Sequence, residues 1–390
     1  KPRRNVRLIY FSEEYIMREN EEQTYTCSEC GAVVNEENLH TFDEHVLCDE
    51  CLERLMVTCD NCGRRIWRTD AECDSYTALC SHCYEYHYTN CEHCGRLIEC
   101  DSANYDEDDD FPYCDECYRE IQESVIKSYN YKPEPTFYGS GDLFYGVELE
   151  VDKGGERSDY AESILNVANK DNNYLYAKHD GSIDDGFEIV SHPMTLEYHT
   201  NSINWSDVME MALSLGYRSH QTYTCGLHVH VNRNAFGKDY DTQEDAISRI
   251  VHFVEMHWNE LLKFSRRTEA NMNRWASRYG ISNTAKDTYK NAKAKHCGRY
   301  VAVNLENYAT IEFRLFRGTL KYKTFLATLQ LVDEICNLAI KLSDKELESM
   351  SWSDFVGQIN SDKSELIEYL KAKRLYINEP VDISLETEVE

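Results

Sequence analysis

The sequence predicts an α+β fold in which three small cysteine-rich ribbons precede an antiparallel sheet with helices, and a helical region follows. Two patterns support this organisation. Cysteine pairs recur at a fixed interval near the N-terminus, and farther along short stretches alternate apolar with charged residues, as half-buried strands do. The chain of 390 residues is long enough for several domains with a sizeable core.

Changes in composition indicate the domain boundaries. Residues 130–142 contain Pro133, Pro135 and several turn residues, and no cysteine pair follows them, which is typical of a linker. Helical periodicity dominates from residue 321 until an acidic stretch after Pro380, which we expect to be disordered. We therefore expect an N-terminal segment at 1–26, ribbons at 27–58, 59–90 and 91–130, a linker at 131–140, a sheet domain at 141–320, a helical region packing on it at 321–378, and an acidic tail at 379–390.

The overall charge excludes some classes of partner. The formal net charge is −29, from 41 basic and 70 acidic residues. Such a field repels nucleic acid and anionic membrane surfaces, so general nucleic-acid binding is not expected. We find no apolar stretch of about 18 residues, the length that a membrane span needs, and therefore expect no membrane association.

The cysteines are concentrated where metal ligands are expected. Fourteen of the 17 lie between residues 27 and 117, and twelve of these form Cys-x-x-Cys pairs. Three pairs begin 32 residues apart, which indicates a threefold repeat resembling treble-clef and LIM-like zinc ribbons. Four thiolates from two successive pairs make a closed tetrahedral site, typical of structural zinc in a reducing compartment. The repeat predicts three zinc ions, with the ligands Cys27, Cys30, Cys48, Cys51, Cys59, Cys62, Cys80, Cys83, Cys91, Cys94, Cys114 and Cys117.

Several strand-like stretches carry potential ligands on one face. The stretches "GVELEVD", "GFEIVS", "GLHVHVN" and "TIEFRLF" alternate apolar residues with carboxylates, imidazoles or an arginine. An ordinary solvated strand face alternates in the same way and remains an alternative. Oxygen-rich ligand sets of this type suit Mg²⁺ or Mn²⁺, which neutralise phosphates. The residues concerned are Glu148, Glu150, Glu188, His228, His230, Glu312 and Arg314.

One segment has the opposite charge. Residues 265–299 contain nine basic residues and two acidic ones, a net charge of +7. The sequence lacks both a phosphate loop and a dinucleotide fingerprint, so a bound nucleotide would depend on metal ions and arginines. The basic segment is compatible with a flexible solvated loop and with a lid that closes over an anionic substrate.

The order of these motifs resembles the amidoligase family, carboxylate–amine ligases that share the glutamine synthetase fold. The resemblance covers roughly residues 138–325 and rests on "GVELE", "DGSIDDGFEIVSHP", "CGLHVHV" and "TIEFR". It implies that residues 141–320 form a glutamine synthetase-like catalytic domain. Amidoligases of this branch occur widely in bacteriophages, so a bacteriophage origin is compatible with the sequence.

The resemblance also implies a role for each motif residue. Arg314 and Arg299 would stabilise the transferring phosphoryl group, and Asp180 would take the proton of the amine. Asp180 stands where glutamine synthetases have glutamate. The implied ligands of Mg²⁺ (or Mn²⁺) are Glu148, Glu150, Glu188, His228 and Glu312. The implied ligands of the ATP phosphates are His230, Arg314 and Arg299, and the basic segment adds Arg266 and Arg267 as expected phosphate ligands.

The implied reaction is an ATP- and Mg²⁺-dependent ligation of a carboxylate to an amine through an acyl phosphate, which yields an amide or isopeptide bond. A metal-dependent hydrolase with the same residues and a non-catalytic zinc-ribbon adaptor are the alternatives. The expected partners are carboxylate and amine substrates, among them proteins or peptides, and a protein bound by the ribbons. We expect a cytoplasmic location, which is the host cytoplasm if the protein is viral.

Overall fold

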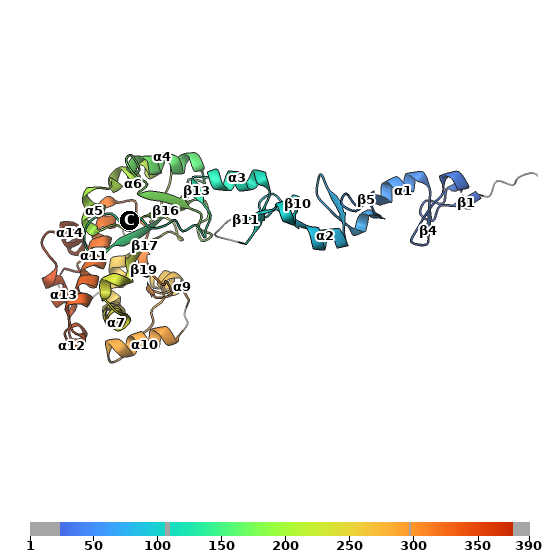
Figure 1. Cartoon of the computed structure of the whole chain (residues 1–390). Coiled ribbons are helices and arrows are strands. Elements are labelled where there is room, and N and C mark those ends of the chain that lie inside the picture. The colour runs from blue at the N-terminus through green and yellow to red at the C-terminus, as the bar shows by residue number, and fades with distance from the viewer. Residues whose placement is uncertain (1–23, 106–109, 296–297, 377–390) are drawn as a thin grey trace, which may run out of the picture. The chain divides into compact units, whose positions relative to one another are not determined.

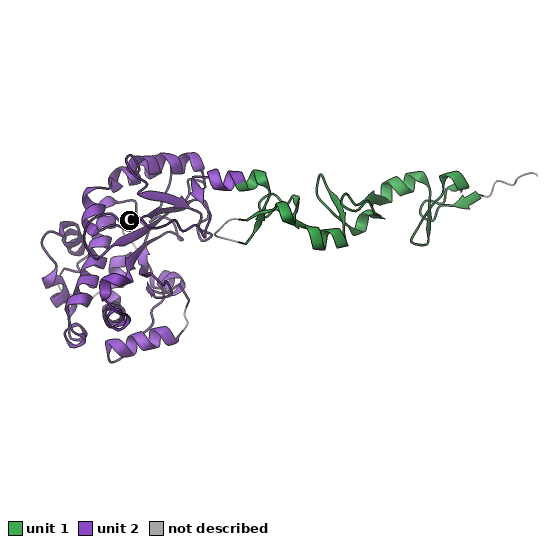
Figure 2. Ribbon diagram, viewed as in Figure 1, with its two compact units in different colours: residues 1–118 green, residues 119–390 purple. Residues whose placement is uncertain are grey.

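The computed structural model describes residues 24–105, 110–295 and 298–376, and the chain divides into two compact units between Tyr118 and Arg119 (Figure 2). The division falls within helix α3 (Asp115–Glu123). Most of the expected N-terminal segment (1–26) and all of the expected acidic tail (379–390) lie outside the described residues. The other expected domain boundaries stay predictions.

Unit 1 repeats one small motif three times (Figure 1). Each repeat has a two-stranded antiparallel hairpin, one turn of 3-10 helix, a second hairpin and an α-helix. Each of the first two helices leads directly into the next strand, so the repeats follow one another without a linker. The first repeat contains β1 (Thr24–Thr26), β2 (Val33–Asn35), β3 (His40–Phe42), β4 (His45–Leu47) and α1 (Asp49–Leu55).

The second and third repeats follow the same order. The second contains β5 (Met56–Thr58), β6 (Arg65–Trp67), β7 (Ala71–Cys73), β8 (Ala78–Cys80) and α2 (Ser81–His87). The third contains β9 (Tyr88–Asn90), β10 (Leu97–Glu99), β11 (Asn104–Tyr105), β12 (Pro112–Tyr113) and α3. The threefold repeat that the cysteine spacing predicts is therefore present in the fold.

A seven-stranded sheet forms the centre of unit 2, with the strand order β13–β15–β16–β14–β17–β19–β18. Neighbouring strands are antiparallel except for the short edge pair of β13 and β15, which is parallel. The predicted α+β class with an antiparallel sheet is confirmed. The strands are β13 (Ile126–Lys127), β14 (Tyr145–Val151), β15 (Leu175–Lys178), β16 (Phe187–Ser191), β17 (Gly226–Asn232), β18 (Val303–Asn304) and β19 (Thr310–Arg317).

The ladder between β17 and β19 contains an irregularity. Leu227 of β17 pairs with Phe316 of β19, whereas Val229 pairs with Phe313. β19 therefore has one more residue than β17 between these two pairs, which is a β-bulge. As a result Leu315 and Phe316 are both buried, although simple alternation would turn one of them to the other face.

One face of the sheet and the helices share a single apolar core. Val147 and Leu149 of β14 lie in this core, and the rings of Trp205 and Phe325 meet there at 4.6 Å between centroids. The charged residues on the other face are therefore positioned by a rigid support. The helices are α4 (Ser158–Ala168), α5 (Leu196–Asn201), α6 (Trp205–Ser214), α7 (Tyr240–Met256), α8 (Trp258–Ser265), α9 (Glu269–Trp275), α10 (Ala285–Ala294), α11 (Tyr322–Lys341), α12 (Asp344–Glu348), α13 (Trp352–Gln358) and α14 (Ser364–Ala372).

The basic segment 265–299 is helical over much of its described length, where it forms α9 and α10. Its cations pair with acidic residues of α7. Lys293 lies 2.8 Å from Glu244, and Arg278 lies 2.9 Å from Glu255. The positive charge of the segment thus matches negative charge on the helix beside it. Among the described residues, no helix is both long and apolar enough to cross a membrane.

Candidate active site

The charged residues of the central strands lie on one face of the sheet. Glu148 of β14 is paired with His228 of β17, and His230 is paired with Glu312 of β19. Because side chains alternate along a strand, the apolar neighbours of these residues point into the core. The strand register therefore brings four potential ligands together from three adjacent strands.

Glu148, His228 and Glu312 form a compact group. One ligand atom from each residue lies within 4.8 Å of the other two. His228 Nδ1 is 3.2 Å from Glu148 Oε2 and 3.7 Å from Glu312 Oε1. The side chains of His228 and Glu312 are 5% and 4% exposed, so water offers them little solvation. Two carboxylates and an imidazole that converge in this way fit a hard divalent cation such as Mg²⁺ or Mn²⁺.

His230 borders this group and has unused bonding capacity. Its Nδ1 is 3.1 Å from Thr310 Oγ1, within hydrogen-bond distance. Its Nε2 lies 3.1 Å from Glu148 Oε1 but makes no hydrogen bond to any described residue. A buried nitrogen that approaches a carboxylate without hydrogen bonding to it leaves room for another ligand, such as a phosphate oxygen.

Charge and burial act in opposite directions in this group. Burial opposes ionisation of Glu148, but the charge of His230 and the hydrogen bonding of His228 hold its pKa well below the usual range. Burial also opposes ionisation of Glu312, yet the charge of His230 outweighs it and the pKa is lowered. In turn, Glu148 and Glu312 overcome the effect of burial and raise the pKa of His230 to about 9. Protonated His230 thus neutralises part of the negative charge.

Glu150 lies beside the group and is tied to the start of β17. It is 3% exposed, and burial raises its pKa. Its carboxylate accepts a hydrogen bond from the Gly226 N–H and lies 3.6 Å from His228 Nε2. Gly226 has no space for a side chain, because a Cβ there would stand 2.6 Å from His228 Nε2. Glycine at this position lets the imidazole sit against the strand.

Asp180 and Glu188 form a buried pair of carboxyl groups, 8% and 5% exposed. Burial, the nearby charge of Glu148 and hydrogen bonding to Asp180 raise the pKa of Glu188 well above its usual value. Burial has the same tendency at Asp180, but hydrogen bonds from Glu188 and Ser182 outweigh it and lower the pKa of Asp180. The pKa values of the two groups are therefore pushed apart, with the protonated form favoured at Glu188 and the ionised form at Asp180.

A buried arginine, Arg267, and a partly buried one, Arg314, flank the carboxylates. Arg314 donates a hydrogen bond to Glu312, and Arg267 donates one to the Phe316 carbonyl at 3.2 Å. The Nε of each arginine is buried and finds no acceptor among the residues that the structure describes. Burial lowers the pKa of Arg267 to about 10. Guanidinium groups with unused donors are well suited to phosphate oxygens.

Arg266 and Arg299 are placed differently. Arg266 donates to the carbonyl oxygens of Arg317 and Gly318, so it supports the end of β19. Arg299 lies over the ring of Tyr300, 5.1 Å from its centroid, and Arg314 lies 5.8 Å from the same centroid. Arg299 and Arg314 therefore both lie close to the same aromatic ring.

Three polar residues of the site were not predicted from the sequence. Asn304 of β18 and Asn307 of the following loop donate to Glu312 Oε2 at 2.8 and 3.4 Å. Thr310 lies within hydrogen-bond distance of His230. The sequence does contain one signal for this site. Asn304 directly follows the apolar residues 301–303, and an amide that is buried at the end of a strand needs a hydrogen-bond partner.

The twelve predicted cysteine ligands form three groups of four in unit 1. Each group brings together the two pairs of one repeat, and the sulfur atoms of Cys30 and Cys48, for example, are 3.7 Å apart. Corner-to-corner distances in a tetrahedral zinc–thiolate site with bonds of about 2.3 Å are about 3.8 Å. Gly31 adopts a φ of +75°, which lets its N–H turn back to the Cys27 carbonyl at 3.0 Å. The groups fit structural zinc.

Neighbouring repeats of unit 1 are joined by polar side chains. Arg68 of the second repeat donates to the carbonyl of Arg54 at 3.2 Å, near the end of α1 in the first repeat. Asp74 of the second repeat accepts a hydrogen bond from the Leu97 N–H of the third repeat at 2.7 Å. The second repeat therefore contacts both of its neighbours.

Comparison with known proteins identifies the central part of the chain. The family model described as "Putative amidoligase enzyme" matches residues 166–336. This segment is similar to the amidoligase family. The match contains Glu188, His228, His230, Glu312 and Arg314, whereas Glu148 and Glu150 precede it.

Other comparisons add little to the amidoligase assignment. The chain is similar to the crystal structure of a bifunctional glutathione synthetase from Pasteurella multocida, with 13% identity and a TM-score of 0.31. The likeness covers 61% of this chain and 45% of that chain, so this chain spans less than half of that protein. A TM-score this low supports no conclusion about activity. No curated protein sequence matches the chain.

Proposed function

We propose that the protein is an ATP- and Mg²⁺-dependent ligase that joins a carboxylate to an amine through an acyl phosphate. The observation that supports this most is the convergence of Glu148, His228 and Glu312, within 4.8 Å of one another, beside buried arginine nitrogens without acceptors. The arrangement occurs in a domain whose larger part matches the amidoligase family. Anion-binding and cation-binding groups side by side suit a metal–nucleotide complex.

The carboxylates would hold the divalent cations, with Glu148, His228 and Glu312 at one site and Glu150 and Glu188 beside it. Bound cations would neutralise charge on the β- and γ-phosphates. Glu188 would have to release its proton on binding a cation, because ligating carboxylates are ionised. Asn304 would orient Glu312 by the hydrogen bond to its second oxygen.

Arg314 and Arg267 would bind the phosphates. Their Nε–H groups are buried and have no acceptor among the described residues. They are therefore available to donate hydrogen bonds to phosphate oxygens. Donors that are fixed before the reaction stabilise the charge that develops on a transferring phosphoryl group. Arg299, which lies near the same Tyr300 ring as Arg314, would approach the phosphates from the side of that ring.

The reaction then has two steps. A substrate carboxylate oxygen attacks the γ-phosphorus, forms an acyl phosphate and releases ADP. The amine attacks the acyl carbon and displaces inorganic phosphate. Asp180 is the group we propose to accept the proton of the amine, because its lowered pKa keeps it ionised.

Trapping of the intermediate tests this function. The protein is incubated with ATP, Mg²⁺, hydroxylamine and a library of carboxylates and peptides. Hydroxylamine displaces phosphate from an acyl phosphate, so a ligase yields hydroxamates together with ADP, and mass spectrometry identifies the carboxylate. Hydrolysis of the library without ATP would instead favour a metal-dependent hydrolase. Absence of both activities would favour a non-catalytic scaffold. The variant Glu312→Gln, which should be inactive, provides the matched control.

A further inference from the structure

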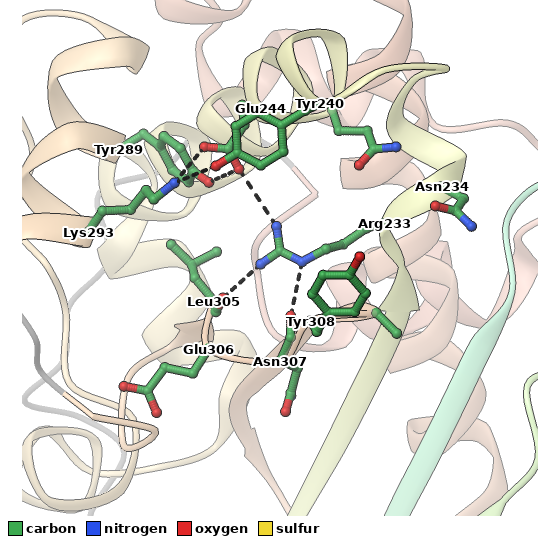
Figure 3. A pocket seen from close by; sticks show the side chains of 12 residues that line it. Arg233, Asn234, Tyr240, Glu244, Tyr289, Lys293, Leu305, Glu306, Asn307 and Tyr308 are labelled. Atoms are coloured by element: carbon green, nitrogen blue, oxygen red, sulfur yellow. Dashed lines mark hydrogen bonds and ion pairs between the residues drawn. The ribbon is translucent and has the colours of Figure 1, made fainter. Parts of the chain in front are cut away.

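A pocket of about 450 Å³ is lined in part by the loop between β18 and β19 (Figure 3). Its size is within the range typical of small-molecule sites, roughly 300–1,000 Å³. Its walls come from the start of α7, from α10 and from residues 305–309 of the loop. The sequence pattern gave no indication of it.

The cations in the wall of this pocket are engaged with the protein. Arg233 donates to the carbonyls of Leu305 at 2.7 Å and Asn307 at 3.0 Å, and lies 3.7 Å from Glu244. Lys293 donates to Glu244 at 2.8 Å and to the Tyr240 hydroxyl at 3.0 Å. Figure 3 shows the guanidinium of Arg233 in the middle of these contacts. The pocket therefore offers little free positive charge to an anionic group such as a phosphate.

The remaining polar groups in the wall are aromatic rings, neutral amides and one carboxylate, that of Glu306. Tyr240 and Tyr308 are 63% and 98% exposed, which leaves their rings accessible, and Tyr289 is buried behind them. The side-chain amides of Asn234 and Asn307 also line the pocket. Rings that stack and amides that hydrogen-bond to a ring edge are the means by which proteins bind nucleobases. The lining thus fits a flat, uncharged heteroaromatic group.

The pocket is joined to the carboxylate group through one short loop. Asn307 lines the pocket and donates to Glu312, and the loop continues directly into Thr310, which contacts His230. We infer that this pocket binds the adenine base of the nucleotide while the carboxylates and arginines hold its phosphates. This inference rests on the proposed function, because it requires that ATP is the substrate.

The experiment compares the binding of Mg-ATP with that of Mg-tripolyphosphate, which has the phosphates but no base. Tyr240→Ala/Tyr308→Ala should weaken ATP binding by roughly tenfold or more, since removal of a stacking ring costs about that much per base, and leave tripolyphosphate binding unchanged. Tyr240→Phe/Tyr308→Phe is the matched control, because it retains both rings and should bind ATP almost normally. Arg314→Lys should weaken both ligands.

Each other outcome contradicts a specific statement. Equal ATP affinity in the alanine and wild-type proteins would show that the base binds elsewhere. An alanine variant with normal ATP affinity but a raised KM for the carboxylate or amine would assign the pocket to that substrate instead. If the wild-type protein binds no Mg-ATP at all, both this inference and the proposed function are wrong. Ultraviolet cross-linking with 8-azido-ATP gives an independent check, with labelling expected in residues 233–244 or 305–309.

Discussion

Arg314 donates a hydrogen bond to Glu312, its neighbour on the same face of β19, and keeps its Nε free and buried. The pair joins a proposed cation ligand to a proposed phosphate ligand. Glu312→Gln keeps the size of the side chain but removes its charge, and Arg314→Lys keeps the charge but loses the planar fork. Each change should lower the ATP-dependent turnover by roughly 10²-fold or more, the usual effect of losing one preorganised electrostatic contact.

The zinc content and melting temperature of both variants should stay close to those of the wild-type protein, because these side chains do not form the apolar core. Normal turnover in either variant, with both controls preserved, would remove that residue from the mechanism.

Asn304 should affect cation affinity without binding the cation itself. It is 3% exposed and donates to Glu312 Oε2 at 2.8 Å, so it fixes the orientation of that carboxylate. Asn304→Ala should raise the Mg²⁺ concentration needed for half-maximal ATP turnover by roughly 10–100-fold. Asn291→Ala, at an exposed asparagine of α10, provides the control. An unchanged Mg²⁺ requirement in Asn304→Ala would contradict the proposed position of the cation.

ATP binding should depend strongly on Mg²⁺. Without a cation, the buried carboxylates of the site repel the triphosphate, and this repulsion is large where water is excluded. Isothermal titration calorimetry should therefore show affinity for ATP lowered by roughly tenfold or more when EDTA replaces Mg²⁺. Glu312→Gln should reduce the difference between the two conditions. Equal affinities in the wild-type protein would refute the arrangement that we propose.

Three zinc ions should bind per chain. Cys59→Ser/Cys62→Ser removes two thiolates from the middle group, and metal analysis should then give about two zinc ions instead of three. Cys73→Ser is the control, because Cys73 is an exposed cysteine outside the three groups and its loss should leave the count at three. Fewer than two zinc ions in the wild-type protein would contradict the assignment.

Buried His199 should make the protein sensitive to acid. Its Nδ1 accepts a hydrogen bond from Trp205 Nε1 at 3.2 Å, and its Nε2 lies 2.9 Å from the Tyr145 carbonyl, so the contacts require the neutral ring. Burial lowers the pKa of His199 to about 4. An unfolded histidine takes up its proton near pH 6.5. The stabilising contribution is therefore complete above pH 6.5 and is lost as the pH falls towards 4.

Urea unfolding at pH 7 and pH 4.5 measures this effect. His199→Gln can keep both hydrogen bonds and stays neutral, so it should lose less stability than the wild-type protein between these pH values. Equal losses in the two proteins would show that His199 does not titrate on unfolding. Other groups, such as His257, whose pKa burial also lowers to about 4, act equally in both proteins.

Local patterns predicted much of the fold. The alternation of "GVELEVD" and "GLHVHVN" corresponds to β14 and β17, because their apolar residues face one core. Strand β15 was not predicted, since its four residues are too few to show a clear period. The edge strand β13 depends on pairing with a distant segment, and no local pattern carries that information.

The candidate site was predicted only where a strand places it. Glu148, His228 and Glu312 follow from alternation and register, which act over a few residues. Asn307 lies in a loop, and its contact with Glu312 depends on how the loop folds back on β19. The pocket beside it is formed by side chains from three separate segments, so its existence follows from tertiary packing alone.

The extra residue in β19 has an evolutionary consequence. Pairing is regular on both sides of the bulge, at Val229 with Phe313 and at Leu227 with Phe316. Loss of a single codon, that of Leu315, would let the two regular stretches join and would place Arg314 directly across from His228. A deletion of this kind would alter the ligand arrangement while the sheet around it kept its pairs. Among homologues, therefore, the number of residues between Glu312 and Phe316 should vary less than their identity.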